Sequence, residues 1–187
     1  MVILIGGVGY AGKTFMAQNL LEKYKYPSLS IDHLKMGLYR ADIGCGFTPT
    51  DSCELISDKL WPILKGIITT CVENNQNHII EGCYLYPEKI NELESEYLSH
   101  VISFYLGFST TYIEKYFESK VLKHRSVIEQ RGELCDKWDV AKQHILLNKA
   151  QKEICGKFNA KYFEIQNNYE EEIKCVYDWI DSELIKK

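Results

Sequence analysis

The sequence predicts an α/β protein, in which a parallel sheet carries helices on both faces. Two observations support this prediction. Short apolar segments of strand length recur along the chain, and each is followed by a segment with the apolar spacing of a helix. The first apolar segment runs directly into a glycine-rich turn, after which a helical pattern begins. Strands that alternate with helices form parallel sheets, whose carboxyl ends then meet at one edge.

Each strand is predicted from a short apolar run bounded by residues that break regular structure. The second run follows Pro27, and the third is closed by Gly82. The first run is apolar throughout, so we expect it to be buried. The expected strands are Val2–Ile5, Ser28–Ile31, His78–Glu81, Val101–Leu106 and Lys161–Ile165.

The helices are predicted from apolar side chains at helical spacing. The broadest apolar stripe belongs to the segment 51–74, where Pro62 should kink or split the helix. Two glycines and a proline make Ala41–Thr50 a loop. The expected helices are 13–24, 33–40, 51–74, 88–97, 110–131, 134–158 and 170–184, with Gly132 between the fifth and the sixth.

Length, charge and cysteines narrow the class of protein. We expect one domain over residues 1–187, because that length suits a single core. The net charge of −4 and the absence of a basic block argue against nucleic-acid partners. No stretch is long enough to span a membrane, and no signal peptide is apparent, so we expect a cytoplasmic protein. The seven scattered cysteines are expected to be mostly buried free thiols. The oligomeric state is not indicated.

The segment 7–14 fits G-x-x-x-x-G-K-[ST], the phosphate-binding P-loop. Its glycines let backbone N–H groups form a nest for phosphate oxygens, and the following helix adds its positive end. Lys13 is expected to reach the β- and γ-phosphates, and the Thr14 hydroxyl suits Mg²⁺. The alternative is a glycine-rich turn with a solvated lysine. The predicted cofactor-binding residues are Gly7, Val8, Gly9, Tyr10, Ala11, Gly12, Lys13 and Thr14.

Two carboxylates end strands at the same predicted edge. Asp32 is either the N-cap of the next helix or the group that orients the hydroxyl of a phosphate acceptor, and the two roles are compatible. Glu81 is a candidate to hold Mg²⁺ through water or to contact the acceptor, the alternative being a solvated charge. Gly82 favours a function for Glu81, because it allows close approach of other groups.

Basic residues supply the remaining candidates. Arg40 lies two helical turns after Asp32, so it is either a ligand for an anionic group of the acceptor or a surface arginine. The charged region at about 110–135 is expected to form a lid over the phosphates. Arg125 or Arg131 would then stabilise the transferred phosphoryl group, although most charges of such a segment belong to a solvated face.

These residues resemble the small P-loop kinases. The resemblance rests on Gly7–Thr14, on Ser30-Ile31-Asp32-His33-Leu34 with Arg40, and on Ile79-Ile80-Glu81-Gly82. The segment 79–87 is similar to the I-I-E-G-x-x-x-x-P stretch of 2-phosphoglycerate kinases. The Asp32 region is also similar to the acceptor-activating aspartate of chloramphenicol phosphotransferases, zeta-type toxins and polynucleotide kinases.

The resemblance implies a P-loop NTPase fold with strand order 2-3-1-4-5, a helical lid, and ATP with Mg²⁺. It assigns phosphate and Mg²⁺ to Lys13 and Thr14, the acceptor hydroxyl to Asp32, and the metal-water or acceptor shell to Glu81. The chain departs from adenylate kinases, because no arginine follows the third strand as in their D-G-F-P-R-like segment. Cys83-Tyr84 replaces the Val-His of 2-phosphoglycerate kinases.

The leading hypothesis is an ATP-dependent kinase that phosphorylates a hydroxyl of a small molecule. One alternative is a nucleoside monophosphate kinase with an altered acceptor site. Another is a non-catalytic module that binds ATP and regulates a partner. The acceptor itself is not named by the sequence, because loop and lid segments would build its pocket.

Overall fold

The computed structural model describes residues 1–42, 44–123 and 137–186. Their strands form one sheet in which all pairings are parallel and the order is β2-β3-β1-β4-β5. The predicted α/β class and strand order are therefore confirmed. The strands are β1 (Val2–Gly7), β2 (Ser28–Ser30), β3 (His78–Glu81), β4 (Val101–Phe108) and β5 (Lys161–Ile165).

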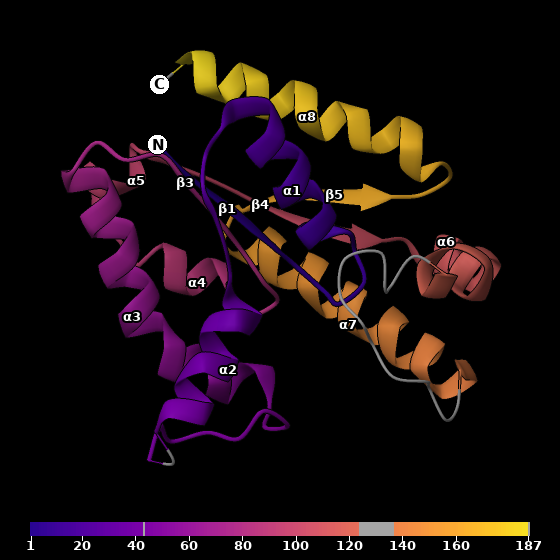
Figure 1. The fold of residues 1–187 in the computed structure, drawn as a ribbon. Helices are drawn as coiled ribbons and strands as arrows, with labels where there is room; N and C mark the ends of the chain where they lie inside the picture. The colour runs from indigo at the N-terminus through magenta and orange to yellow at the C-terminus, as the bar shows by residue number, and fades with distance from the viewer. Residues whose placement is uncertain (43, 124–136, 187) are drawn as a thin grey trace.

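Helices cover both faces of this sheet, with α1 and α8 on one face and α3, α4 and α7 on the other (Figure 1). A π-helix, η1, continues directly from α6. The helices are α1 (Lys13–Tyr24), α2 (Ile31–Ala41), α3 (Cys53–Glu73), α4 (Pro87–Ile90), α5 (Ser95–Leu98), α6 (Thr110–Tyr116), η1 (Phe117–Leu122), α7 (Lys137–Lys157) and α8 (Tyr169–Lys186).

The central strand β1 belongs to two hydrophobic cores at once. Val2 and Leu4 pack with α3, while Ile3 and Ile5 pack with α1 and α8, and all four side chains are fully buried. Successive side chains of a strand point to opposite faces, so an unbroken apolar run is what a strand covered on both sides requires. This burial fixes the end of β1, and hence the loop that follows it.

Three details differ from the sequence prediction. Helix α2 begins at Ile31 and its N-cap is Ser30, so Asp32 lies inside the first turn and is not the N-cap. The reason is that β2 ends early, where Ile31 turns into the core against Gly82. Of the two outcomes predicted for Pro62, a kink or a split, the split does not occur, because Leu60 and Trp61 beside it are buried and their packing outweighs the lost hydrogen bond.

The third difference is at 88–97, where one helix was expected and two short ones form. Contacts with α3 hold the chain in a turn between them. The carboxylate of Glu92 accepts a hydrogen bond from Trp61 (2.8 Å), and its main-chain oxygen accepts one from Lys65 (3.0 Å). These bonds stabilise the turn between α4 and α5, so a single helix does not continue through residues 91–94.

The cysteines are more exposed than predicted. Of the six that the structure describes, only Cys71 and Cys155 are buried: Cys45 and Cys83 lie in loops, Cys53 begins α3, and Cys175 lies on an exposed face of α8. Cys135 lies outside the described residues. Among the helices described, none combines the length and the apolar character needed to cross a membrane.

Candidate nucleotide and acceptor site

The loop between β1 and α1 turns tightly around the Lys13 side chain. Lys13 opens α1, and its ammonium curls back to donate a hydrogen bond to the carbonyl of Val8 (2.7 Å). The lysine is nearly buried, with 8% of its surface exposed. Gly12, which precedes it, has a φ of 85°, a left-handed conformation that lets the chain turn from loop to helix. The predicted P-loop residues therefore come together around the start of α1.

Gly7 shows why this loop needs glycine. Its φ is 123°, and a Cβ there would lie 2.1 Å from the carbonyl oxygen of Leu106 on β4. Any side chain would therefore push β1 away from its neighbour and would also strain the backbone. The glycine spacing of the motif is thus a packing requirement as well as a phosphate signature.

Strand register brings Glu81 to the P-loop. Ile5 of β1 pairs with Glu81 of β3, and Ser30 of β2 pairs with Glu81 from the other side. The segments that follow β1, β2 and β3 therefore begin next to one another at one edge of the sheet. The Thr14 hydroxyl donates a hydrogen bond to a carboxylate oxygen of Glu81 (3.2 Å), and Glu81 is only 3% exposed. Glu81 is therefore not a solvated charge at a strand end.

The Thr14–Glu81 pair fits a magnesium ion. Mg²⁺ takes oxygen ligands and is usually bound by one or two protein groups together with substrate phosphates and waters. A hydroxyl and a carboxylate side by side, next to the P-loop, are protein groups of this kind. Among the described residues no cluster of three or more His, Cys, Asp or Glu side chains is arranged for a metal.

Asp32 is held by a lysine that the sequence analysis did not single out. Lys35, one turn further along α2, donates from its ammonium to a carboxylate oxygen of Asp32 (2.9 Å) and to the hydroxyl of Tyr84 (2.6 Å). The Lys35 side chain is 10% exposed, whereas the Asp32 side chain is 37% exposed. The arrangement buries the cation and leaves the carboxylate open to a ligand. The i, i+3 spacing of the two residues was the available signal.

Tyr84 is fixed in turn by α3. The Ser57 hydroxyl donates to the carbonyl of Tyr84 (2.7 Å), and Ser57 is buried. Burial is the main cause that raises the pKa of Tyr84, and the nearby charges of Cys83 and Asp32 raise it further, so its phenol stays protonated at neutral pH. Asp32 is thus positioned by residues from α2, the loop after β3 and α3.

A thiol pair lies on the same side of the site. The side chain of Cys53, the first residue of α3, is the main influence on Cys83, and it lowers the pKa of that thiol. The positive charges of Lys13 and Lys35 lower that pKa further, while the Asp32 carboxylate opposes them. Cys83 therefore lies within electrostatic reach of both Lys13 and Asp32. Cys53 and Cys83 are too far apart in the sequence for any local pattern to predict that they lie together.

The predicted arginines have different outcomes. Arg40 is exposed in the last turn of α2, and it has no hydrogen-bond or ion-pair partner within the described part of the chain. The structure puts Lys35, not Arg40, beside Asp32. Arg125 and Arg131 lie outside the described residues.

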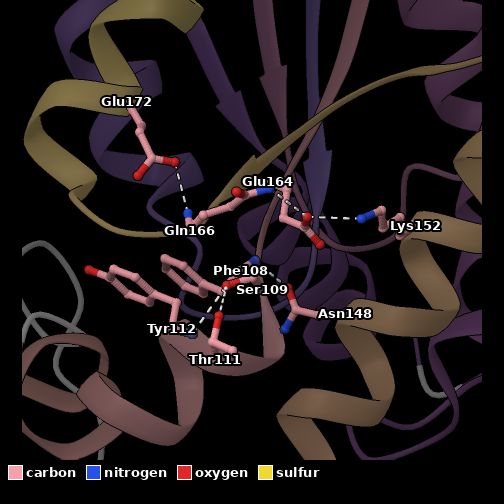
Figure 2. Close-up of polar contacts among 9 residues, drawn as sticks. All are labelled: Phe108, Ser109, Thr111, Tyr112, Asn148, Lys152, Glu164, Gln166 and Glu172. Atoms are coloured by element: carbon pink, nitrogen blue, oxygen red, sulfur yellow. Dashed lines mark hydrogen bonds and ion pairs between the residues drawn. The ribbon is translucent and has the colours of Figure 1, made fainter.

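The ends of β4 and β5 form the remaining part of this edge (Figure 2). The side chain of Asn148 on α7 accepts a hydrogen bond from the backbone N–H of Phe108 (2.6 Å). The Glu172 carboxylate on α8 accepts from the backbone N–H groups of 166, 167 and 168 at 2.7–2.8 Å. Burial alone would raise the pKa of Glu172, but these three bonds lower it. The loop after β5 is therefore pinned by protein contacts.

A surface groove of about 250 Å³ lies at the opposite edge of the sheet, where Val101 begins β4 and Lys161 begins β5. It shares no residue with the P-loop or with the Asp32 network. The P-loop, the Thr14–Glu81 pair and the Asp32–Lys35 pair all lie at the carboxyl edge of the sheet, where ligands of open parallel sheets bind. The groove is therefore not part of the candidate site.

Comparison with known proteins shows which solved structures have a similar fold. No family model matches the chain, and no curated protein matches its sequence. Its structure is similar to that of a shikimate kinase from Aquifex aeolicus (TM-score 0.56, 16% identity, all of both chains covered). It is also similar to a shikimate kinase from Bacteroides thetaiotaomicron (0.55, 13%, 97% and 98% covered) and to a gluconokinase from Sinorhizobium meliloti (0.53, 16%, 92% and 87% covered).

At these identities the likeness concerns the fold. The chain thus has a P-loop NTPase fold, with a parallel sheet in the order β2-β3-β1-β4-β5 and an overall structure similar to that of solved kinases. The resemblance to the small P-loop kinases is supported at this level. The narrower likeness to 2-phosphoglycerate kinases stays a prediction.

Proposed function

We propose that this protein is an ATP-dependent kinase that transfers the γ-phosphoryl group to a hydroxyl of a small molecule. One observation carries the proposal. Two sets of residues lie at the carboxyl end of β3. The first is the Thr14–Glu81 pair, beside the P-loop. The second is Asp32 of α2, which is paired with Lys35 and follows the strand β2 that neighbours β3. A protein that only binds nucleotide has no need for a carboxylate positioned as Asp32 is.

The donor half consists of the P-loop and Glu81. The backbone N–H groups of 7–14 and the Lys13 ammonium would bind the phosphates of ATP, and Lys13 would leave the Val8 carbonyl to do so. Thr14 and Glu81 would hold Mg²⁺ directly or through water. When bound, the metal neutralises charge that develops on the phosphoryl oxygens.

The acceptor half is centred on Asp32. The acceptor hydroxyl would donate its hydrogen to the free carboxylate oxygen, because Lys35 occupies the other. The hydroxyl oxygen forms a bond to the γ-phosphorus, the bond from that phosphorus to the leaving oxygen of ADP breaks, and the hydroxyl proton passes to Asp32. In a loose transition state the orientation of the hydroxyl matters more than early proton removal.

The rest of the predicted site enters as a proposal. Lys35 is the cation that orients Asp32, and the exposed Arg40 would contact an anionic group only on an acceptor long enough to span two helical turns. Arg125 or Arg131 would stabilise the transferred group from a lid over the phosphates. A cytoplasmic location and a single domain over 1–187 remain predictions.

The proposal is tested by comparing Asp32→Asn with Asp178→Asn, an exposed aspartate on α8 that serves as the matched control. ATP binding is measured by calorimetry, and transfer from radiolabelled ATP is measured on a panel of hydroxy acids, sugars, polyols and nucleoside monophosphates. We expect Asp32→Asn to bind ATP as the wild type does and to lose transfer by about 10²-fold or more. Transfer at the wild-type rate would remove Asp32 from the mechanism.

The panel also separates the alternatives. Turnover confined to nucleoside monophosphates would identify a nucleotide kinase. Tight ATP binding without transfer to any member would favour the regulatory module. Failure of the wild type to bind ATP would overturn the donor half and the proposal with it.

A further inference from the structure

Tyr10 has an unusual backbone conformation for its position. Its φ is 61°, in the left-handed region that side chains other than glycine rarely adopt. Three other such residues occur in the described chain: Lys25, Asn75 and Asn159. Each of those three follows the end of a helix, where a left-handed residue is a common terminator. Tyr10 instead lies in the middle of the P-loop, between β1 and α1.

The ring of Tyr10 is stacked on His144 of α7. The two ring centres are 5.0 Å apart and the planes differ by 18°. Phe117 of η1 contacts the same imidazole, with its ring centre at 5.3 Å. Gly9 also faces this ring, because a Cβ added at Gly9 would lie 4.0 Å from the Cε1 atom of His144. The imidazole therefore packs against two consecutive residues of the P-loop.

His144 is itself held firmly. Its side chain is nearly buried, and the carbonyl of His144 accepts a hydrogen bond from the Asn148 side chain (2.7 Å). The same Asn148 accepts from the backbone of Phe108 at the end of β4 (2.6 Å), as Figure 2 shows. Lys152, one turn further along α7, pairs with Glu164 of β5 (2.8 Å). Helix α7 thus brings His144 to the P-loop on a support anchored to two strands.

The buried ring nitrogen Nδ1 of His144 does not explain why the residue is there. It has no hydrogen-bond partner among the described residues. The contacts that place the imidazole at the P-loop are those of its flat ring with Tyr10 and Phe117. A flat ring against Tyr10 favours the one backbone conformation that places the tyrosine ring parallel to it.

We propose that His144 is a positioning residue for the nucleotide site: by stacking on Tyr10, it holds the P-loop in the conformation that binds phosphate. The inference rests on nucleotide binding by the P-loop and on no step of phosphoryl transfer. Without the stack, Tyr10 relaxes to negative φ and the loop leaves that conformation. A nucleotide must then restore it, at the expense of affinity.

The test compares Tyr10→Ala with Tyr10→Gly. Both variants lack the stack, but only alanine disfavours positive φ. We expect Tyr10→Ala to bind ATP about tenfold more weakly than Tyr10→Gly, by calorimetry without an acceptor. Equal affinities of the two variants would overturn the proposal. Tyr10 is only partly buried, and circular dichroism checks that both variants are folded.

Variants of His144 complete the test. His144→Ala should weaken ATP binding by about tenfold, and His144→Phe, which keeps a flat ring, should restore it. Adding Tyr10→Gly to His144→Ala should recover most of the lost affinity, a rescue that a general packing defect would not show. Absence of rescue by either change would overturn the proposal. Failure of the wild type to bind ATP would instead refute the donor half of the proposed function, and this inference with it.

Discussion

The donor and acceptor halves of the candidate site are built in opposite ways. The donor half comes almost entirely from one continuous segment, 7–14, to which Glu81 adds one carboxylate. The acceptor half joins Asp32 and Lys35 of α2, Tyr84 of the loop after β3 and Ser57 of α3. A continuous segment carries its geometry in its own backbone, whereas a dispersed set depends on the fold that gathers it. The two halves should therefore respond differently to substitution.

The largest effect is expected from Lys13→Met in the donor half. Loss of the ammonium removes the charge aimed at the phosphates, so transfer should fall by about 10²–10³-fold and ATP affinity should fall with it. Steady-state kinetics and calorimetry measure the two quantities. Lys174→Met, an exposed lysine on α8, is the control. Loss of transfer with intact ATP affinity would contradict the role given to Lys13.

A smaller effect, with a different signature, is expected from Lys35→Met in the acceptor half. Asp32 loses the partner that fixes one of its oxygens, and misplacement of such a group costs about 10²-fold or less in transfer. ATP affinity should stay close to that of Lys174→Met. If ATP binding weakened as much as transfer, Lys35 would belong to the donor half and the division between the halves would be wrong.

Glu81→Gln tests the residue that lies between the two halves. Glutamine keeps an oxygen that can accept the Thr14 hydroxyl but removes the negative charge. The Mg²⁺ concentration needed for half-maximal transfer should rise by about 10-fold or somewhat more, while rates at saturating Mg²⁺ change less. Glu153→Gln, on the exposed face of α7, provides the comparison. An unchanged Mg²⁺ dependence would place Glu81 on the acceptor instead.

The same contrast explains what the sequence could predict. The P-loop, the five strands and their order follow from local pattern and resemblance, because the motif is contiguous and the strands are buried runs. Glu81 was found because it ends a strand. Lys35 was not, because its burial depends on Tyr84, and Tyr84 depends on Ser57. His144 gives no signal in the sequence, since its partner Tyr10 is brought close only by the packing of α7.

The smallest expected effect concerns pH and the support of the donor half. Burial, together with the nearby charge of Lys13, lowers the pKa of His144 from 6.5 to about 4. Above pH 7, His144 is neutral in both the folded and the unfolded chain, so it does not make the unfolding free energy depend on pH in that range. As pH falls below 6.5, the unfolded chain takes up a proton that the folded chain refuses until about pH 4, and stability is lost.

His144→Phe should remove this part of the pH dependence. Between pH 7.5 and 5.5 the wild type should lose about 1 kcal/mol more of its unfolding free energy than the variant does, measured by urea denaturation. Burial also lowers the pKa of His78, which acts in the same direction, so only the difference between the two proteins reports on His144. Equal losses would mean that His144 is protonated as readily in the fold as in water. The imidazole would then be open to solvent rather than closed between the P-loop and η1.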